Sequence, residues 1–158
     1  MGVGPEEYRR ALRRFATGVT IVTVHSDDGP HGMTASSFAA VSLEPPLILV
    51  SLEKSSRTRA LILEGGTFAV NILGVGQESI SREFATRGDK SFENIPHELG
   101  VTRAPILAGS FAWIECTTKE WIDAGDHDVV IAEVIACDVG EGEPLVYYDR
   151  DYRTIKDL

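Results

Sequence analysis

Glycine and proline divide this chain into short apolar runs that are rich in β-branched residues. One run covers residues 19–25, and another covers residues 47–52 directly after Pro45 and Pro46. Further runs lie at residues 33–43, 68–73, 111–122 and 129–139. Short runs bounded by turn residues are typical of β-strands. About six strands joined by short turns, with few helices, predict a mainly β protein: a closed antiparallel barrel with helical additions.

Short helices and one irregular segment complete the predicted organisation. The first helix begins at Pro5 and ends at Gly18, and two others cover residues 58–63 and 77–85. Residues 86–109 show no clear period, and a long irregular segment inside a compact domain is usually a functional loop or a subunit contact. The length of the chain predicts a single domain over residues 1–158.

The composition argues against several classes of protein. A net charge of -9 disfavours nucleic acid as a partner, because phosphate binding depends on Lys and Arg. No apolar run approaches the roughly 18 residues of a membrane span, and the first residues lack the pattern of a secretory signal, so we expect a cytoplasmic protein without membrane contact. Cys116 and Cys137 have no metal-ligand spacing, and we expect both thiols to be reduced and buried.

A cluster of small and hydroxylated residues follows the first predicted turn. Residues 32–37 read Gly-Met-Thr-Ala-Ser-Ser inside an otherwise apolar stretch. Gly32 lets the backbone come close to a bound group, while Thr34, Ser36 and Ser37 offer hydroxyls without bulk. The cluster suits the polar atoms of a flat ligand. From the residues alone, a plain strand whose hydroxyls bond to neighbouring backbone accounts for it equally well.

A second polar cluster, residues 54–59, precedes the second predicted helix. It reads Lys-Ser-Ser-Arg-Thr-Arg, and Ser56 or Thr58 is a suitable helix N-cap. Hydroxyls and N–H groups at a helix start, with Lys54 and Arg59 beside them, also form a site for an anion such as a phosphate. One strand connects the two clusters, which indicates a ligand with two polar ends.

Seven segments, in the same order and over nearly the whole chain, resemble those of the short-chain flavin reductases. They are GMTASSF, VSLEPP, SLEKSSRTRAL, FAVNIL, SREFA, GDHDVVIAEV and PLVYYDRDYR. The resemblance implies an FMN-binding split β-barrel, which is a Greek-key antiparallel barrel with a few short peripheral helices, and a homodimer. It also implies an NAD(P)H-dependent oxidoreductase that reduces FMN or FAD and supplies the reduced flavin to a separate monooxygenase.

The resemblance assigns flavin-binding roles to residues of both polar clusters and of three further segments. The first cluster is implied to lie against the flavin ring, and the second to hold the phosphate and ribityl chain, with Arg59 beside it. The implied contacts are Met33, Thr34, Ala35, Ser36, Ser37, Val41, Ser42, Lys54, Ser55, Ser56, Thr58, Asn71, Phe84 and Ala85. From the residues alone, Asn71 is equally well explained as a buried amide, and Phe84 as a core side chain.

The nicotinamide site is implied by residues near the end of the chain. His127 is implied to orient the reductant, which makes it the catalytic residue, and Arg150 and Tyr152 are implied to contact the nicotinamide nucleotide. Because Asp149 and Asp151 flank Arg150, we expect NADH in preference to NADPH. The acidic residues around His127 fit neither a calcium loop nor a zinc motif, so no metal is expected.

The predicted mechanism requires no nucleophile from the protein. Flavin and nicotinamide carry the hydride chemistry, and the protein supplies positioning and electrostatics. The sequence agrees, since it has neither a persuasive catalytic triad nor the G-x-G-x-x-G loop of a Rossmann site. Two alternatives stay open from the sequence: a flavin carrier or store without nicotinamide turnover, and a flavoenzyme similar to pyridoxamine-phosphate oxidase.

Overall fold

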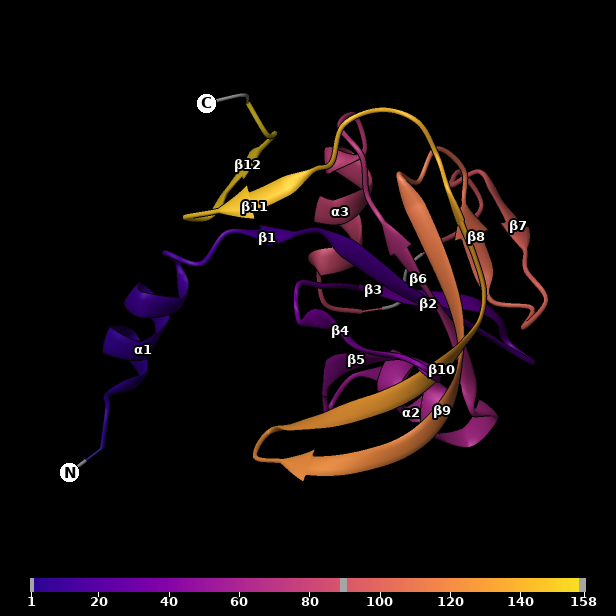
Figure 1. Ribbon diagram of the computed structural model, residues 1–158, viewed down its shortest axis with the longest axis horizontal. Helices are drawn as coiled ribbons and strands as arrows, with labels where there is room; N and C mark the ends of the chain where they lie inside the picture. Colours follow the sequence, from indigo (N-terminus) through magenta and orange to yellow (C-terminus); the bar gives the residue numbers. More distant parts are fainter. Residues whose placement is uncertain (1, 89–90, 157–158) are drawn as a thin grey trace.

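The computed structural model describes residues 2–88 and 91–156, whose largest sheet has seven antiparallel strands (Figure 1). In the order in which they pair, these are β3 (Gly29–Ala35), β2 (Thr20–Ser26), β6 (Thr67–Ile72), β9 (Ala112–Ala124), β10 (His127–Val139), β5 (Pro46–Glu53) and β4 (Phe38–Leu43). The prediction of a mainly β protein is therefore confirmed.

The two edge strands of this sheet are consecutive in the chain. β3 ends at Ala35 and β4 begins at Phe38, so only Ser36 and Ser37 connect one edge of the sheet to the other. Three chain steps reach about 11 Å at most, so the sheet has to curl until its edges lie near each other. Within the described strands β3 and β4 do not pair, so the barrel is split, as the family resemblance implied, and the prediction of a closed barrel was wrong. The prediction of one strand over residues 33–43 was wrong.

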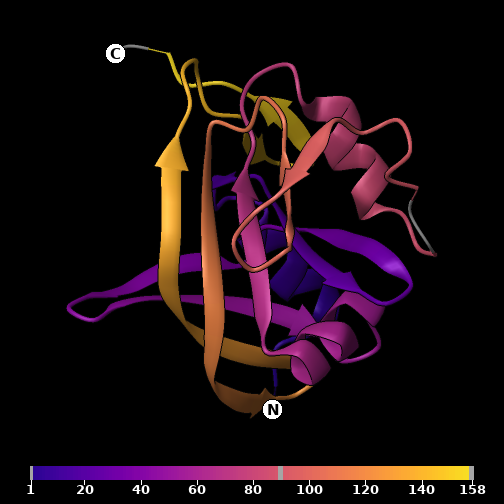
Figure 2. The same ribbon diagram turned by 90° about the vertical axis from the view of Figure 1, so that its right-hand side faces the viewer.

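The helices of the described ranges lie outside this sheet. They are α1 (Pro5–Leu12), α2 (Arg57–Gly65) and α3 (Glu78–Ala85). α2 and α3 contact β2 and β3, and Figure 2 shows them at opposite ends of the barrel, as does Figure 1. α1 stands apart from the barrel and ends at Leu12, so the prediction that it continues to Gly18 was wrong. None of the described helices is long and apolar enough to cross a membrane.

Two smaller sheets extend the barrel. One is formed by β1 (Thr17–Gly18), β11 (Val146–Tyr148) and β12 (Asp151–Arg153), and the other by β7 (His97–Leu99) and β8 (Pro105–Leu107). The turn between β11 and β12 places Asp149 and Arg150 at φ values of 47° and 69°, as a tight hairpin turn requires. The N–H of Asp149 donates to the carbonyl of Arg13 at 3.2 Å, which connects this hairpin to the end of α1.

The core lies on both faces of β2. Val22 and Val24 point to one face, where they pack in a cluster with the buried Ile62 of α2. Ile21 points to the other face, in a cluster with Phe84 of α3. This alternation is the ordinary period of a strand, and burial of both faces explains the continuous apolar run in the sequence. α2 and α3 are therefore held on the barrel from opposite faces of one strand.

Two buried polar side chains hold the segment that was predicted to be irregular. Asn71 of β6 is fully buried, and its amide oxygen accepts the N–H of Leu107 at 2.8 Å. Glu115 of β9 is 1% exposed and accepts the N–H groups of Val101 at 3.1 Å and Thr102 at 2.8 Å, together with the Thr102 hydroxyl. The β7–β8 hairpin is thus fixed to its own barrel.

The two cysteines have different environments. Cys116 of β9 is buried, and burial raises the pKa of its thiol to about 12, so the thiol is protonated at neutral pH. Cys137 is exposed, so the prediction that both thiols are buried was wrong for this residue. Cys137 lies in the outer part of β10, where the side chains no longer alternate between buried and partly exposed.

Glu115→Gln should lower the free energy of unfolding by about 1–3 kcal/mol, because an amide in place of the carboxylate leaves a buried donor without an acceptor. Urea unfolding followed by circular dichroism measures this difference. Glu120→Gln, on the exposed part of the same strand, is the matched control and should change stability by less than about 0.5 kcal/mol. Equal stability of the two variants would show that the carboxylate does not anchor this segment.

Candidate functional site

A cavity of about 560 Å³ opens between β3, residues 53–58 and the C-terminal end of α3. Residues 53–58, which we call the loop at residues 53–58, run from the last residue of β5 to the first turn of α2. Its lining combines hydroxyl, aromatic and charged side chains. It also brings together predicted flavin contacts from three separate segments of the sequence. These are Met33, Thr34, Ser55, Ser56, Thr58, Phe84 and Ala85.

The start of α2 forms one wall of this cavity. Ser56 has extended backbone, and its hydroxyl accepts the N–H of Arg59 at 3.1 Å, which makes it the N-cap. Ser55 donates its hydroxyl to the Glu53 carboxylate at 2.7 Å, and Thr58 is buried in the first helical turn. Because the N–H groups of a first turn carry partial positive charge, this wall favours an anion.

β3 and α3 form the opposite wall. The Thr34 hydroxyl donates to the carbonyl of Ser81 at 2.7 Å. A Cβ atom on Gly32 would lie 3.0 Å from the Phe84 ring and 3.2 Å from the carbonyl oxygen of Val22. The close packing of β3 against α3 therefore accounts for this glycine, in addition to any approach of a ligand. The hydrogen bond of Thr34 and the packing at Gly32 therefore fix β3 relative to α3 in this wall.

A second cavity, of about 510 Å³, lies between α1, the β3–β4 connection and the β11–β12 turn. Ser36 and Ser37 line it, together with Arg13 and Arg150. Thr17 also lines it, and the Thr17 hydroxyl is buried without a hydrogen-bond partner among the described residues. Residues 31–34 line the first cavity and residues 36–37 the second, so one short segment connects a site at a helix start with a site rich in arginine.

His127 lies at the edge of the loop at residues 53–58. It begins β10 opposite Glu53 of β5, and its Nδ1 lies 2.7 Å from the Asp126 carboxylate. The hydrogen bond with the His127 ring lowers the pKa of the Asp126 carboxyl below its usual value. Lys54 is held by the same turn: its ammonium donates to Asp123 at 2.6 Å, and its backbone N–H donates to the carbonyl of Asp126. The Lys54 ammonium is therefore engaged outside the first cavity.

Four further predicted flavin contacts, besides Lys54, line neither cavity. Ala35 is buried, Val41 and Ser42 lie in β4, and Asn71 is buried with its amide bonded to protein groups. Their contact with flavin stays a prediction.

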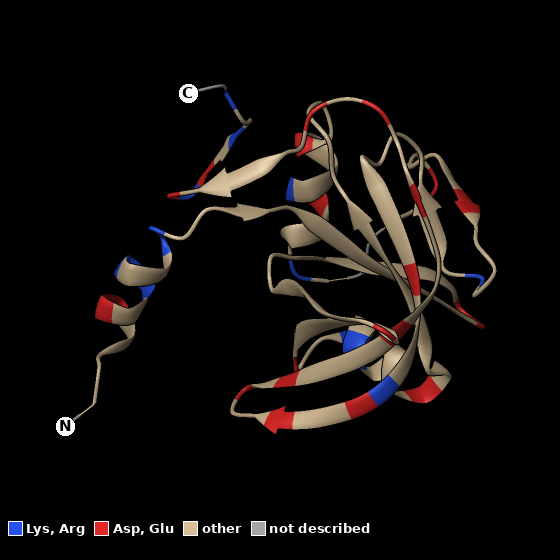
Figure 3. Ribbon diagram, viewed as in Figure 1, with Lys and Arg blue, Asp and Glu red and all other residues tan. Residues whose placement is uncertain are grey.

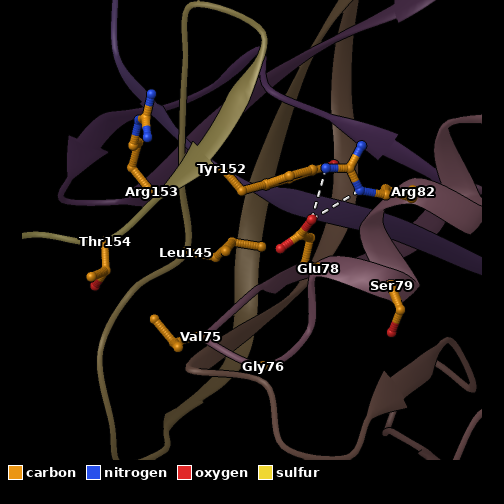
Figure 4. A pocket seen from close by; sticks show the side chains of 9 residues that line it. All are labelled: Val75, Gly76, Glu78, Ser79, Arg82, Leu145, Tyr152, Arg153 and Thr154. Carbon is orange, nitrogen blue, oxygen red and sulfur yellow. Dashed lines mark hydrogen bonds and ion pairs between the residues drawn. The ribbon is translucent and has the colours of Figure 1, made fainter.

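Tyr152 lies in a different hollow from the other predicted residues (Figure 4). This hollow has a volume of about 600 Å³ and lies between α3 and the C-terminal strands. The Tyr152 hydroxyl is 2.8 Å from that of Ser81, and the Arg82 guanidinium lies 4.7 Å from the centre of the ring. Figure 4 shows Arg82 paired with Glu78. This hollow is slightly larger than either the first or the second cavity, but Tyr152 is the one residue of its lining that was predicted to bind a ligand. We therefore place the candidate site at the first and second cavities.

Charged residues to which the sequence analysis assigned no role also line the first cavity. They include Glu53 at the end of β5, Arg87 after α3, and Arg57, which donates to Asp28 at 3.0 Å. Each lies within three residues of a predicted contact, and that proximity was the available signal. In the ranges that the structure describes, no group of three or more His, Cys, Asp or Glu side chains is arranged to hold a metal ion.

The chain is similar to known proteins over most of its length. A family model described as "Flavin reductase like domain" matches residues 12–156. The chain is 38% identical over 146 residues to SmoA of Agrobacterium fabrum, named an FMN reductase (NADH), with 92% of this chain and 83% of SmoA covered. It is 39% identical over 155 residues to HsaB of Rhodococcus jostii, the reductase subunit of a flavin-dependent monooxygenase, with 98% of this chain and 80% of HsaB covered.

A solved structure agrees with these matches. SgcE6 of Streptomyces globisporus, an NADH:FAD oxidoreductase in complex with NAD and FAD fragments, has a TM-score of 0.92 and 35% identity. That similarity covers 99% of this chain and 97% of SgcE6. The split barrel, the order of the motifs and the extent of these matches lead to one conclusion: the chain belongs to the flavin reductase-like family.

Proposed function

We propose that this protein is an NADH-dependent flavin reductase that reduces FMN or FAD and supplies the reduced flavin to a separate flavin-dependent monooxygenase. The observation that carries the proposal is the course of one short segment, whose residues 31–34 line a cavity at a helix start and whose residues 36–37 line a second cavity rich in arginine. A flavin nucleotide has the same two-ended character, with a phosphate at one end and a flat polar ring at the other. The names of SmoA and HsaB support this reading.

The first cavity has the groups that a flavin phosphate requires. Ser55 and Thr58 bring hydroxyls to the start of α2, and Arg87 brings a positive charge. The Ser55 hydroxyl, which donates to Glu53 in this structure, would turn to the phosphate. Met33 on the facing wall, which is partly exposed, offers apolar surface to the less polar parts of the ligand, and the buried Phe84 ring supports that wall from behind. The donor set of this cavity therefore fits a flavin nucleotide.

The second cavity is our proposed location for the nicotinamide nucleotide and the ring end of the flavin. Arg13 and Arg150 complement phosphate groups, and the buried Thr17 hydroxyl offers an unused hydrogen bond. Bound flavin supplies the hydride acceptor. The protein contributes position: Ser36 and Ser37 place the ring, and His127 orients the reductant without transferring a proton.

We also propose that residues 1–158 form one domain and that two copies associate as a homodimer. Large apolar side chains are exposed, with Leu43 at 95%, Val139 at 79% and Phe15 at 73%. Figure 3 shows basic residues on α1, and it shows that the charged residues of the β9–β10 hairpin are mostly acidic. Residues 86–109, which were expected to supply the contact, bury Phe92 and Leu107 in the core of their own subunit. We therefore assign the interface to α1, β4 and the outer part of β10.

Light scattering of the purified protein should give twice the 17.2 kDa of one chain. Leu43→Glu should shift the protein towards the mass of one chain, because it places a charge in the proposed apolar contact. Val101→Glu is the matched control: Val101 is 75% exposed in the segment that we exclude from the interface, and its variant should stay dimeric. A wild-type mass of one chain would contradict the homodimer.

NADH oxidation, followed by its near-ultraviolet absorbance, tests the proposed function directly. The purified protein should oxidise NADH under air when FMN or FAD is present. It should oxidise NADPH more slowly under the same conditions. Activity that depends on added flavin would mean that flavin exchanges as a substrate, and activity without it would mean that flavin stays bound. Absence of turnover with every pair of flavin and nicotinamide would refute the proposal.

His127→Ala should raise the KM for NADH and slow hydride transfer by about tenfold, because it removes a positioning contact of the reductant. The dissociation constant for oxidised flavin should change by less than about twofold. His25→Ala, near the end of β2 and in the lining of neither cavity, is the control. Loss of flavin binding in the His127 variant would show that this division of the site between flavin and nicotinamide is wrong.

A further inference from the structure

Arg59 and Asp128 form an ion pair that is largely shielded from solvent. Their side chains are 24% and 8% exposed. Nε of Arg59 donates to Oδ2 of Asp128 at 2.8 Å, and Nη2 of Arg59 donates to the same oxygen. The guanidinium carbon lies 5.6 Å from the centre of the Trp121 ring. The pair therefore joins α2 to β10, and Trp121 of β9 supports it from the neighbouring strand.

A contribution to stability does not by itself account for this pair. Taking two charges out of water costs about as much free energy as their attraction returns, and apolar side chains of similar size often stabilise a protein equally well. A buried ion pair has a different property: each partner is strongly unfavourable without the other. The two elements that carry Arg59 and Asp128 are therefore restricted to arrangements in which the charges meet.

The elements joined by this pair are the ones that border the first cavity and carry His127. Arg59 lies in the first turn of α2, and its backbone N–H is the group capped by Ser56. Asp128 directly follows His127 and lies opposite Leu52, the residue before the loop at 53–58. Lys54 attaches the other part of the same loop to the β9–β10 turn. The loop is thus fixed to one hairpin at two points.

We infer that the Arg59–Asp128 pair is a positioning device that keeps the loop at residues 53–58 and His127 in a fixed relation. The inference rests on the proposed function, because it assigns the flavin phosphate to this loop and the reductant to His127. Arg59 acts through Ser55 and Ser56 and does not bind the phosphate itself, since its guanidinium is held by Asp128 and does not line the cavity.

The test replaces both partners, so that neither charge is left buried alone. Arg59→Met combined with Asp128→Leu should fold, because apolar side chains of similar size tolerate this exchange. Its dissociation constant for FMN, measured by flavin fluorescence, should rise about tenfold, because the phosphate loop is no longer held. Riboflavin lacks the phosphate, and its dissociation constant should rise by less than about twofold.

The ratio of the dissociation constant for FMN to that for riboflavin distinguishes the two explanations. It should rise if the pair positions the phosphate loop, and it should stay constant if the variant loses structure generally. Equal weakening of FMN and riboflavin, or unchanged binding of both, would overturn the inference. Lys119→Met combined with Glu133→Gln removes a cross-strand ion pair of the same hairpin, roughly 20 Å along β10 from His127, and should leave the ratio unchanged.

A conservative variant keeps the inference testable if the double variant does not fold. Arg59→Lys retains the charge but has a single donor nitrogen and loses the planar contact with Trp121, so its ratio should lie between those of the wild type and the double variant. A wild-type ratio in Arg59→Lys would then count against positioning by the guanidinium. Wild-type protein that never oxidises NADH would end the proposed function, whereas an active wild type with an unchanged ratio in the variants would end this inference alone.

Discussion

The connection between β3 and β4 is the constraint on which the rest of the structure depends. Ser36 and Ser37 carry the chain from one edge of the seven-stranded sheet of the described ranges to the other. So short a connection cannot cross an open sheet, and the sheet therefore curls until β3 contacts β5. The edges of the described sheet do not pair, and β3 also lies near β5 without pairing with it. We call the gap between β3 and the residues that follow β5 the seam. The first cavity lies along that seam.

The groups around the seam are held by many polar contacts that have no reactive role. Ser56 caps α2, Thr34 bonds to the backbone of α3, and Lys54 bonds to the β9–β10 turn. Each contact fixes one wall relative to its neighbour. This arrangement suits a reaction in which the ligands carry the chemistry, because the rate then depends on how accurately two flat rings are placed. The protein therefore contributes a rigid arrangement of the two ligands and no nucleophile of its own.

The sequence predicted the features that depend on local pattern. The runs at residues 47–52 and 68–73 became β5 and β6, because strand period and turn residues act over a few neighbours. The break at Ser36 and Ser37 was not predicted, since no glycine or proline marks it and its cause is closure of the whole sheet. The end of α1 at Leu12 and the exposure of Cys137 also depend on tertiary packing. Local sequence pattern does not show which surfaces pack against each other.

The candidate site was predictable to the extent that its residues lie in contiguous motifs. Most of the second polar cluster lines the first cavity, whereas Lys54 and Arg59, the cations that looked most suited to a phosphate, are bound by carboxylates of the β9–β10 hairpin. The sequence shows which side chains carry opposite charges, but only the fold determines which of them come into contact. A net charge of -9 is compatible with an anion site for the same reason, because the acidic residues of that hairpin lie apart from the arginines of α1 (Figure 3).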